Sequence, residues 1–270
     1  MDNGNKLGRR RIVRLLLVAT GVIFLFLLFF ATWHWWRMKG DEEPETLANL
    51  SGLQAGDILV PDRIDREDPQ RYFTARPIDY EIRERIMGKS YRENADISLE
   101  ELSYLTVLHY NFDHQIQVGE LIVHRQIEQD ILEIFLELFQ SEYEIHSMYL
   151  VDRYYETEGE DAGEIADYNS NSDNNTSAFN YRKVAGSNVL SNHAMGMAID
   201  INPLQNPCVA VNADGSYANT YPDIERYANR GTHEPHMIDR DDLCYRLFTQ
   251  HGFTWGGEWE TPKDYQHFEK

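Results

Sequence analysis

The longest uncharged segment of the chain, residues 15–36, most narrows the structures that this sequence can adopt. It reads LLLVATGVIFLFLLFFATWHWW and contains no Asp, Glu, Lys or Arg. As a helix it would be about 33 Å long, enough to cross a hydrocarbon core of about 30 Å. Trp33, Trp35 and Trp36 lie at its end, where aromatic side chains mark a membrane interface. We therefore predict a single transmembrane anchor over 15–36.

Basic residues concentrate before this run. Five Lys and Arg residues lie within residues 1–14, and only Arg37 and Lys39 follow closely. The positive-inside rule then predicts a cytoplasmic basic tail over 1–14 and an extracytoplasmic position, on the periplasm or cell-wall side, for the rest. A cleaved signal peptide is the alternative, but its apolar region is usually about 7–15 residues long and ends in small residues.

The remainder of the chain is strongly acidic. The formal charge is −20 overall and +6 over residues 1–39, so residues 40–270 carry −26. A surface of that sign excludes nucleic acid as an expected partner, because phosphate binding needs clustered Lys and Arg. Residues 37–75 are acidic, contain prolines and show no long apolar period, so we predict a stalk there. Within it, residues 57–60 are either a short edge strand or a docking segment.

Residues 76–270 show the patterns of a folded α+β domain. Predicted helices begin after Ser98, span 126–140, and run from an Asp239 cap to Gln250, with Gly252 at the exit. Predicted strands are 119–124, 144–151 and 198–202, and the polar stretch 155–181 is predicted as a loop. The mixture has no regular βαβ period, which favours α+β with a small mixed, mainly antiparallel sheet and flanking helices.

Two segments near the C-terminus carry residues suited to metal chemistry. His193 and Asp200 converge on one point if a turn follows the histidine and a strand carries the aspartate. Imidazole and carboxylate are normal zinc ligands, and a third ligand at His267 would leave one tetrahedral position open for water. Asp264, three residues before His267, is then placed to accept a proton from that water.

These segments also resemble a known family. The pattern Ser191-x-His193-x-x-Gly196-x-Ala198-x-Asp200 is similar to the signature of the VanY-like D-Ala-D-Ala carboxypeptidases. The pattern Trp255-Gly-Gly-x-Trp259, followed by Asp264-x-x-His267-Phe268, resembles the closing motif of the same peptidoglycan peptidases, the LAS type, especially their L-Ala-D-Glu endopeptidase branch. The resemblance implies a hedgehog/DD-peptidase-like fold for the domain over 76–270.

The resemblance also assigns roles to individual residues. It implies one Zn²⁺ held by His193, Asp200 and His267, with Asp264 as the general base. A positive side chain often supports the scissile carbonyl or the substrate carboxylate in such enzymes. The candidates for that role are Arg182 and, as the alternative, Arg153. Ser191 is expected to hydrogen-bond the substrate or a ligand. Trp255 and Trp259 are interpreted as core or groove wall, and Trp255 is the candidate for the substrate groove.

The implied function is that of a membrane-anchored zinc peptidase acting on the peptide stem of peptidoglycan, in the manner of a D-Ala-D-Ala carboxypeptidase. A carboxypeptidase needs a pocket for a terminal carboxylate, whereas an L-Ala-D-Glu endopeptidase, the first alternative, needs a cleft open at both ends. The second alternative is a catalytically silent, zinc-containing module that binds the cell wall. No protein partner is expected.

Two further features complete the expectations. Cys208 and Cys244 would lie on the oxidising side of the membrane, which suggests a disulfide worth about 3–4 kcal/mol in the chain-entropy model. His233 and His236 look like a metal pair, but Thr232, Glu234 and Pro235 indicate a loop, so they are not expected to be ligands.

Overall fold

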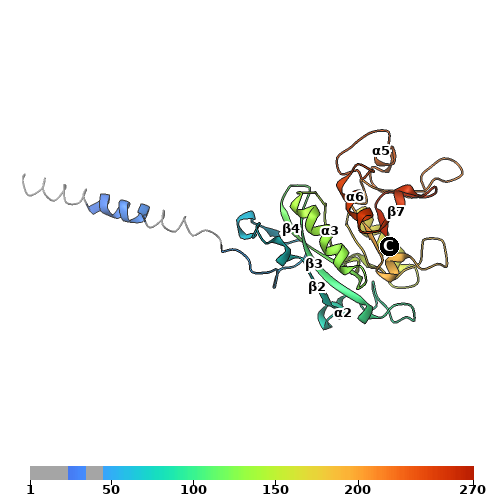
Figure 1. Cartoon of the computed structure of the whole chain (residues 1–270), viewed down its shortest axis with the longest axis horizontal. Helices are drawn as coiled ribbons and strands as arrows, with labels where there is room; N and C mark the ends of the chain where they lie inside the picture. Colours follow the sequence, from blue (N-terminus) through green and yellow to red (C-terminus); the bar gives the residue numbers. More distant parts are fainter. Residues whose placement is uncertain (1–23, 35–44) are drawn as a thin grey trace, which may run out of the picture. The chain divides into compact units, whose positions relative to one another are not determined.

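The computed structural model describes residues 24–34 and 45–270 (Figure 1). Residues 24–34 are helical, and residues 46–270 form one compact unit. In these two described ranges, no helix is both long and apolar enough to cross a membrane. The predicted anchor over 15–36 lies partly outside the described residues, and the basic tail over 1–14 lies wholly outside them.

A four-stranded antiparallel sheet forms the first half of the compact unit. Its order is β1 (Ile58–Leu59), β4 (Ile116–His124), β3 (Leu102–Tyr110) and β2 (Thr74–Pro77). Helix α3 (Glu128–Gln140) lies over the sheet and packs against β3 and β2 (Figure 1). It turns a regular apolar stripe toward them, which includes Ile131, Ile134 and Leu138. The predicted helix over 126–140 and strand over 119–124 are thus confirmed.

The helix predicted after Ser98 is wrong. Ser98 and Glu101 do form a reciprocal capping box, but the helical turn η3 (Leu99–Glu101) stops there and β3 follows. Nearly every residue of β3 is buried, because the strand is covered on both faces. Leu102, Leu105 and Leu108 are therefore three members of a continuously buried strand. Their spacing happens to match that of one face of a helix, which is why the sequence predicted a helix.

The predicted stalk over 37–75 also needs correction. Residues 46–75 belong to the compact unit, which begins 30 residues before the expected boundary, whereas 37–44 lie outside the described residues. The segment includes η1 (Pro61–Arg63), η2 (Pro69–Tyr72) and the edge strand β1, as residues 57–60 suggested. It contributes five side chains to the main core: Leu50, Leu59, Ile64, Tyr72 and Phe73. The sequence did not predict this packing, because the apolar residues of this acidic, proline-containing segment are widely spaced and follow no regular period.

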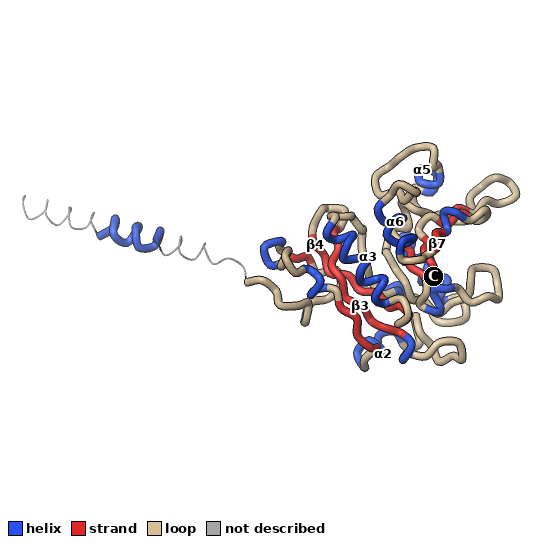
Figure 2. Tube along the Cα trace, in the orientation of Figure 1, coloured by secondary structure: helices blue, strands red, loops and turns tan. Residues whose placement is uncertain are grey.

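Two smaller antiparallel sheets build the second half of the unit (Figure 2). The first has the order β5 (Ala198–Asp200), β9 (His267–Glu269), β7 (Thr254–Trp255), and the second pairs β6 (Cys208–Val209) with β8 (Lys263–Asp264). Helix α6 (Leu243–Gln250) contacts α3 and joins the two halves. The remaining elements are α2 (Tyr80–Ile86), η4 (Val151–Tyr154), η5 (Asn192–Met195), α5 (Ile224–Ala228) and η6 (Gly256–Glu258).

Several local expectations differ from the structure. Asp242, not Asp239, caps α6 by accepting a hydrogen bond from the Cys244 amide at 2.7 Å. Residues 144–151 form isolated bridges and no strand. The predicted loop over 155–181 contains helix α4 (Ala162–Ser172). The buried stripe of α4 includes Ala162, Ala166 and Ser170, which are too small and too polar to signal an amphipathic helix.

The fold class is α+β as predicted, with antiparallel pairing in all three sheets of the described residues instead of one mixed sheet. Cys208 and Cys244 are both free, so the suggested disulfide is not formed. Cys244 is fully buried in the core, and Cys208 faces a cavity described below.

Candidate functional site

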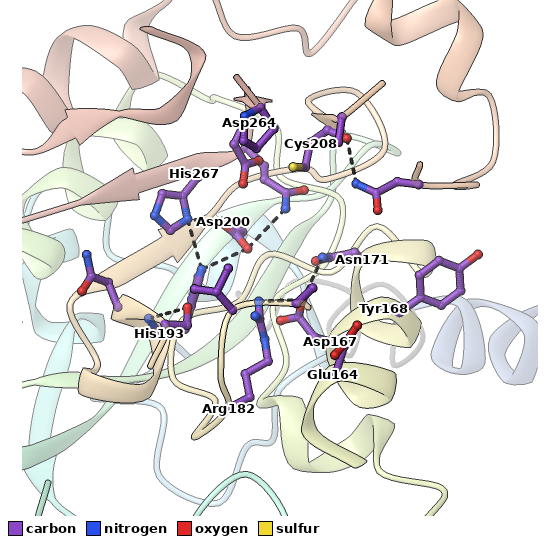
Figure 3. A pocket seen from close by; sticks show the side chains of 18 of the residues that line it. Glu164, Asp167, Tyr168, Asn171, Arg182, His193, Asp200, Cys208, Asp264 and His267 are labelled. Carbon is purple, nitrogen blue, oxygen red and sulfur yellow. Dashed lines mark hydrogen bonds and ion pairs between the residues drawn. The ribbon is translucent and has the colours of Figure 1, made fainter. Parts of the chain in front are cut away.

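Three side chains from separate elements meet at one buried point (Figure 3). His193 is carried by η5, Asp200 by β5 and His267 by β9, and the β5–β9 register places Asp200 directly opposite His267. Asp200 Oδ2 lies 3.2 Å from His193 Nε2, and Asp200 Oδ1 lies 3.0 Å from His267 Nδ1. One ligand atom from each of the three residues lies within 4.8 Å of the others, so the group could hold a metal ion.

The turn after His193 depends on a glycine. Gly196 has φ of +67°, and its carbonyl accepts a hydrogen bond from the His124 amide at 2.8 Å. A Cβ atom at Gly196 would lie 2.6 Å from that same amide nitrogen. The glycine therefore lets the His193 turn lie directly against β4.

Each histidine has its orientation set by its other ring nitrogen. His193 Nδ1 donates to the carbonyl of Ala178 at 2.6 Å, which leaves Nε2 facing Asp200. His267 Nε2 donates to Glu269 Oε2 at 3.0 Å, which leaves Nδ1 facing Asp200. Such partners fix the tautomer of a metal-binding imidazole. The sequence reasoning missed Glu269, although its position two residues after His267 in a strand places both side chains on one face.

Asp264 lies beside this group on β8. Strand β8 pairs with β6, which puts Asp264 opposite Cys208. Gly256 allows the chain to pass closely, because a Cβ there would lie 2.6 Å from the Asp264 carbonyl oxygen. Oδ1 of Asp264 is buried and has no hydrogen-bond partner in the described part of the chain.

The electrostatics of the group follow from burial and mutual proximity. Burial opposes the charge on Asp200, but His193 and His267 hold the pKa of Asp200 well below its usual range. Burial also opposes charge on His267, yet its hydrogen bonds to Asp200 and Glu269 raise its pKa to about 10. Burial and the nearby Asp200 raise the pKa of Asp264 to about 7. The carboxyl groups of Asp200, Asp264 and Glu269 give the site a negative potential, which attracts a cation.

The donor set fits the metal that the sequence implied. Two imidazole nitrogens and one carboxylate are a normal zinc set, and three protein ligands are typical of a site that leaves a position for water. The buried, unpaired Oδ1 of Asp264 adds an acceptor next to that set. The residues present therefore fit a zinc ion.

A cavity of about 700 Å³ contains this group. One wall comes from α4, including Glu164, Asp167 and Tyr168, and a second comes from residues 184–185 and 189–192. Trp259 and Pro262 close a third side, and the rings of Trp259 and His267 lie 5.2 Å apart between their centroids. The segment predicted as a loop over 155–181 thus supplies part of the site through α4.

Two of the other predicted site residues line this cavity. The guanidinium of Arg182 donates to Asp167 Oδ2 at 2.7 Å, while its buried Nε has no acceptor among the described residues (Figure 3). Burial opposes its charge, but Asp167 and Asp200 raise the pKa of Arg182. Ser191 caps η5, where its Oγ accepts a hydrogen bond from the His193 amide at 3.3 Å.

The other two predictions need correction. Arg153 does not line the cavity, and its guanidinium lies over the ring of Tyr149 at 4.1 Å. Trp255 is a core residue, 5% exposed, whose Nε1 donates to the Tyr265 carbonyl. The turn η6 separates the two tryptophans of the closing motif, so Trp259 reaches the cavity and Trp255 does not.

The histidine pair in the 232–236 loop lies outside the candidate ligand group found among the described residues. His233 is highly exposed, with Nδ1 lying 3.6 Å from Asp239 Oδ2. The ring of His236 stacks on Phe112, with a centroid separation of 3.8 Å.

Comparison with known proteins gives one match. Residues 185–270 match a family model described as D-alanyl-D-alanine carboxypeptidase. The matched range contains His193, Asp200, Asp264 and His267, whereas Arg182 and α4 precede it. The resemblance to the VanY-like family is thus confirmed over this range. No curated protein and no solved structure matches the chain.

Proposed function

We propose that the protein is a zinc-dependent peptidase that cleaves the peptide stem of peptidoglycan. The observation that carries the proposal is the buried group of His193, Asp200 and His267, with the unpaired carboxylate oxygen of Asp264 in the same cavity. The family match over 185–270 supports D-Ala-D-Ala carboxypeptidase-like peptidase chemistry.

The metal would be held by two imidazole nitrogens, His193 Nε2 and His267 Nδ1, and by the carboxylate of Asp200. When bound, Zn²⁺ would lower the pKa of water and polarise the scissile carbonyl. The other parts of the reaction rest on side chains of this chain.

Asp264 acts as the general base in this proposal. Its unpaired Oδ1 accepts a proton from the attacking water and returns it to the leaving amine nitrogen. Burial and the nearby Asp200 raise the pKa of this carboxyl, which favours its role as a proton acceptor.

Arg182 is the group that stabilises negative charge on the scissile carbonyl oxygen. Its buried Nε has no protein acceptor, and Asp167 holds the guanidinium in position from α4. Ser191 positions His193 through the hydrogen bond to its amide, and Trp259 forms a wall against which a peptide can lie.

One observation favours internal cleavage, the L-Ala-D-Glu endopeptidase alternative. Among the described residues that line the cavity, Arg182 is the one Lys or Arg side chain, and Asp167 already neutralises it. A carboxypeptidase needs a free cation for the terminal carboxylate of its substrate. A cavity without one suits a bond inside the stem better than the last bond.

We further propose that the N-terminal segment anchors the protein in the cell membrane and that the catalytic unit faces the cell wall. The charge asymmetry around residues 15–36 supports this orientation. Fusing a reporter that is active only outside the cytoplasm to the C-terminus tests the orientation, and an inactive but intact fusion contradicts it.

Incubation of the full-length chain with a purified disaccharide-pentapeptide tests the activity. The reaction is run with and without Zn²⁺, and the products are read by mass spectrometry. Loss of one alanine would identify a D,D-carboxypeptidase, and release of a longer peptide from the sugar-linked L-Ala would identify the endopeptidase. If zinc-loaded protein cleaves neither this substrate nor cross-linked peptidoglycan, the proposal fails in favour of a silent wall-binding module.

A further inference from the structure

A second cavity lies behind the strand segment that carries Asp264. It has a volume of about 250 Å³ and shares no lining residue with the larger cavity. Tyr265 forms one of its walls, whereas the neighbouring Asp264 and Gln266 line the larger cavity. Consecutive residues of one chain segment therefore face two different cavities.

The polar feature of the second cavity is the guanidinium of Arg230. It lies 3.8 Å from the centroid of the Tyr265 ring. Nη1 donates to the Gln205 carbonyl at 3.4 Å, and Nη2 donates to Asn206 Oδ1 at 3.2 Å. Nε is buried, and no described residue accepts a hydrogen bond from it. The stacking and the two neutral acceptors hold the group in place without neutralising it.

Arg230 also lacks an ion-pair partner among the residues that the structure describes. Asp239, the carboxylate at this cavity, instead lies beside His233 at 3.6 Å. Burial lowers the pKa of Arg230 to about 10, against the opposing effects of Tyr265 and Asp239. Burying half of a charged arginine without a neutralising partner costs free energy, because the charge loses contact with water. A bound anion would offset that cost.

We propose that this second cavity binds a carboxylate carried by a ligand of about one amino-acid residue in size, and that Arg230 recognises it. The planar edge of a guanidinium matches the two oxygens of a carboxylate. A single positive charge with Asp239 nearby suits a monoanion better than a phosphate. Met237, Ile238 and Trp255 supply apolar walls for the rest of the ligand. The proposal is independent of the peptidase reaction and of zinc.

Calorimetric titration of the full-length chain tests the proposal, after metal has been removed with the uncharged chelator 1,10-phenanthroline, so that carboxylates cannot bind at the metal site. The probes are isovalerate and its uncharged match, isovaleramide. Isovalerate should bind saturably, and the amide about tenfold more weakly or worse. Arg230→Gln should weaken isovalerate binding about tenfold or more, whereas Arg226→Gln, at an exposed arginine paired with Glu234, should not change it. Equal binding of both probes, or unchanged binding by Arg230→Gln, overturns the proposal.

Chemical labelling of the unaltered chain gives a second test that does not depend on a variant folding. Phenylglyoxal modifies accessible guanidinium groups, and peptide mass spectrometry reports each arginine separately. Saturating isovalerate should slow labelling of Arg230 severalfold and leave labelling of Arg226 unchanged, and isovaleramide should do neither. If isovalerate leaves the labelling rate of Arg230 unchanged, the cavity does not bind carboxylates through this residue.

Discussion

Glu269 shows how a residue beside the candidate ligands contributes to the site. It accepts a hydrogen bond from His267 Nε2 at 3.0 Å and another from Asn192 Nδ2 at 2.6 Å. It thus fixes the ring of one ligand and ties the η5 turn, which carries the second histidine, to strand β9. The ligand geometry consequently depends on a carboxylate that is not itself among the candidate ligands.

Glu269→Gln should weaken zinc binding about 10- to 100-fold, because the amide is a poorer acceptor for the His267 ring proton. Zinc affinity measured by competition with a chromogenic chelator checks this. Glu258→Gln is the matched control, since Glu258 pairs with Arg240 at the surface and should leave the affinity unchanged. Equal zinc affinity in the two variants would show that Glu269 does not support the ligand.

Asp264→Asn should retain about one zinc per chain and lower kcat by about 10²- to 10⁴-fold, because it removes the proton acceptor but none of the three candidate ligands. Zinc content by atomic absorption and turnover of the stem peptide are measured on the same sample. Asp214→Asn, at an exposed aspartate that accepts hydrogen bonds from Ser216, is the control. Full activity in Asp264→Asn would exclude Asp264 as the base.

At the scale of elements, the site rests on short strands and turns that are held against a long sheet. Strands β5, β8 and β9 contain only two or three residues each, so they cannot fix the ligands alone. The hydrogen bond from the His124 amide to the Gly196 carbonyl attaches the ligand-bearing turn to β4. The long strand β4 thus holds the ligand-bearing turn in place.

Gly196→Ala should destabilise the folded chain by about 2–4 kcal/mol, since it adds a left-handed backbone penalty to a clash with β4. Gly186 is a matched control because it has the same φ of +67° but no atom within 4 Å of the added Cβ. Gly186→Ala should therefore show only the backbone penalty of about 1–2 kcal/mol. Denaturant unfolding of both variants gives the comparison. An equal decrease in the free energy of unfolding would mean that the close approach to β4 does not contribute to the effect of Gly196→Ala.

At the scale of the whole molecule, the compact unit depends on its N-terminal 30 residues. They supply the edge strand β1, part of β2, and five buried core side chains. Burying an apolar side chain of this size contributes about 1.5–3 kcal/mol, so these five together account for about 10 kcal/mol. That is comparable with the full stability of a typical domain.

A fragment of residues 46–270 should fold cooperatively, whereas a fragment of residues 76–270 should not. Differential scanning calorimetry of both fragments tests this, with far-UV circular dichroism as a check on secondary structure. A cooperative transition in the 76–270 fragment at a similar temperature would contradict the assignment of residues 46–75 to the core.

Much of the candidate site was predictable because its determinants are local. The spacing of His193 and Asp200 around a glycine, and of Asp264 and His267, is contained in two short segments. The helix α3, with one buried face, was predictable for the same reason. β3 was not, since the spacing of its buried Leu102, Leu105 and Leu108 after a Ser98 cap imitates a helix. Nor was α4, since its buried stripe consists of small residues.

The sequence by itself determined which residue types could bind a metal and serve as a base, because those requirements are chemical. Only the tertiary structure decided which neighbours support them. Arg182 is held by Asp167 from α4, Glu269 meets Asn192 across 77 positions of the chain, and Trp259 reaches the cavity instead of Trp255. Each of these contacts joins segments whose proximity results from sheet register and helix packing, and no local pattern of residues encodes such proximity.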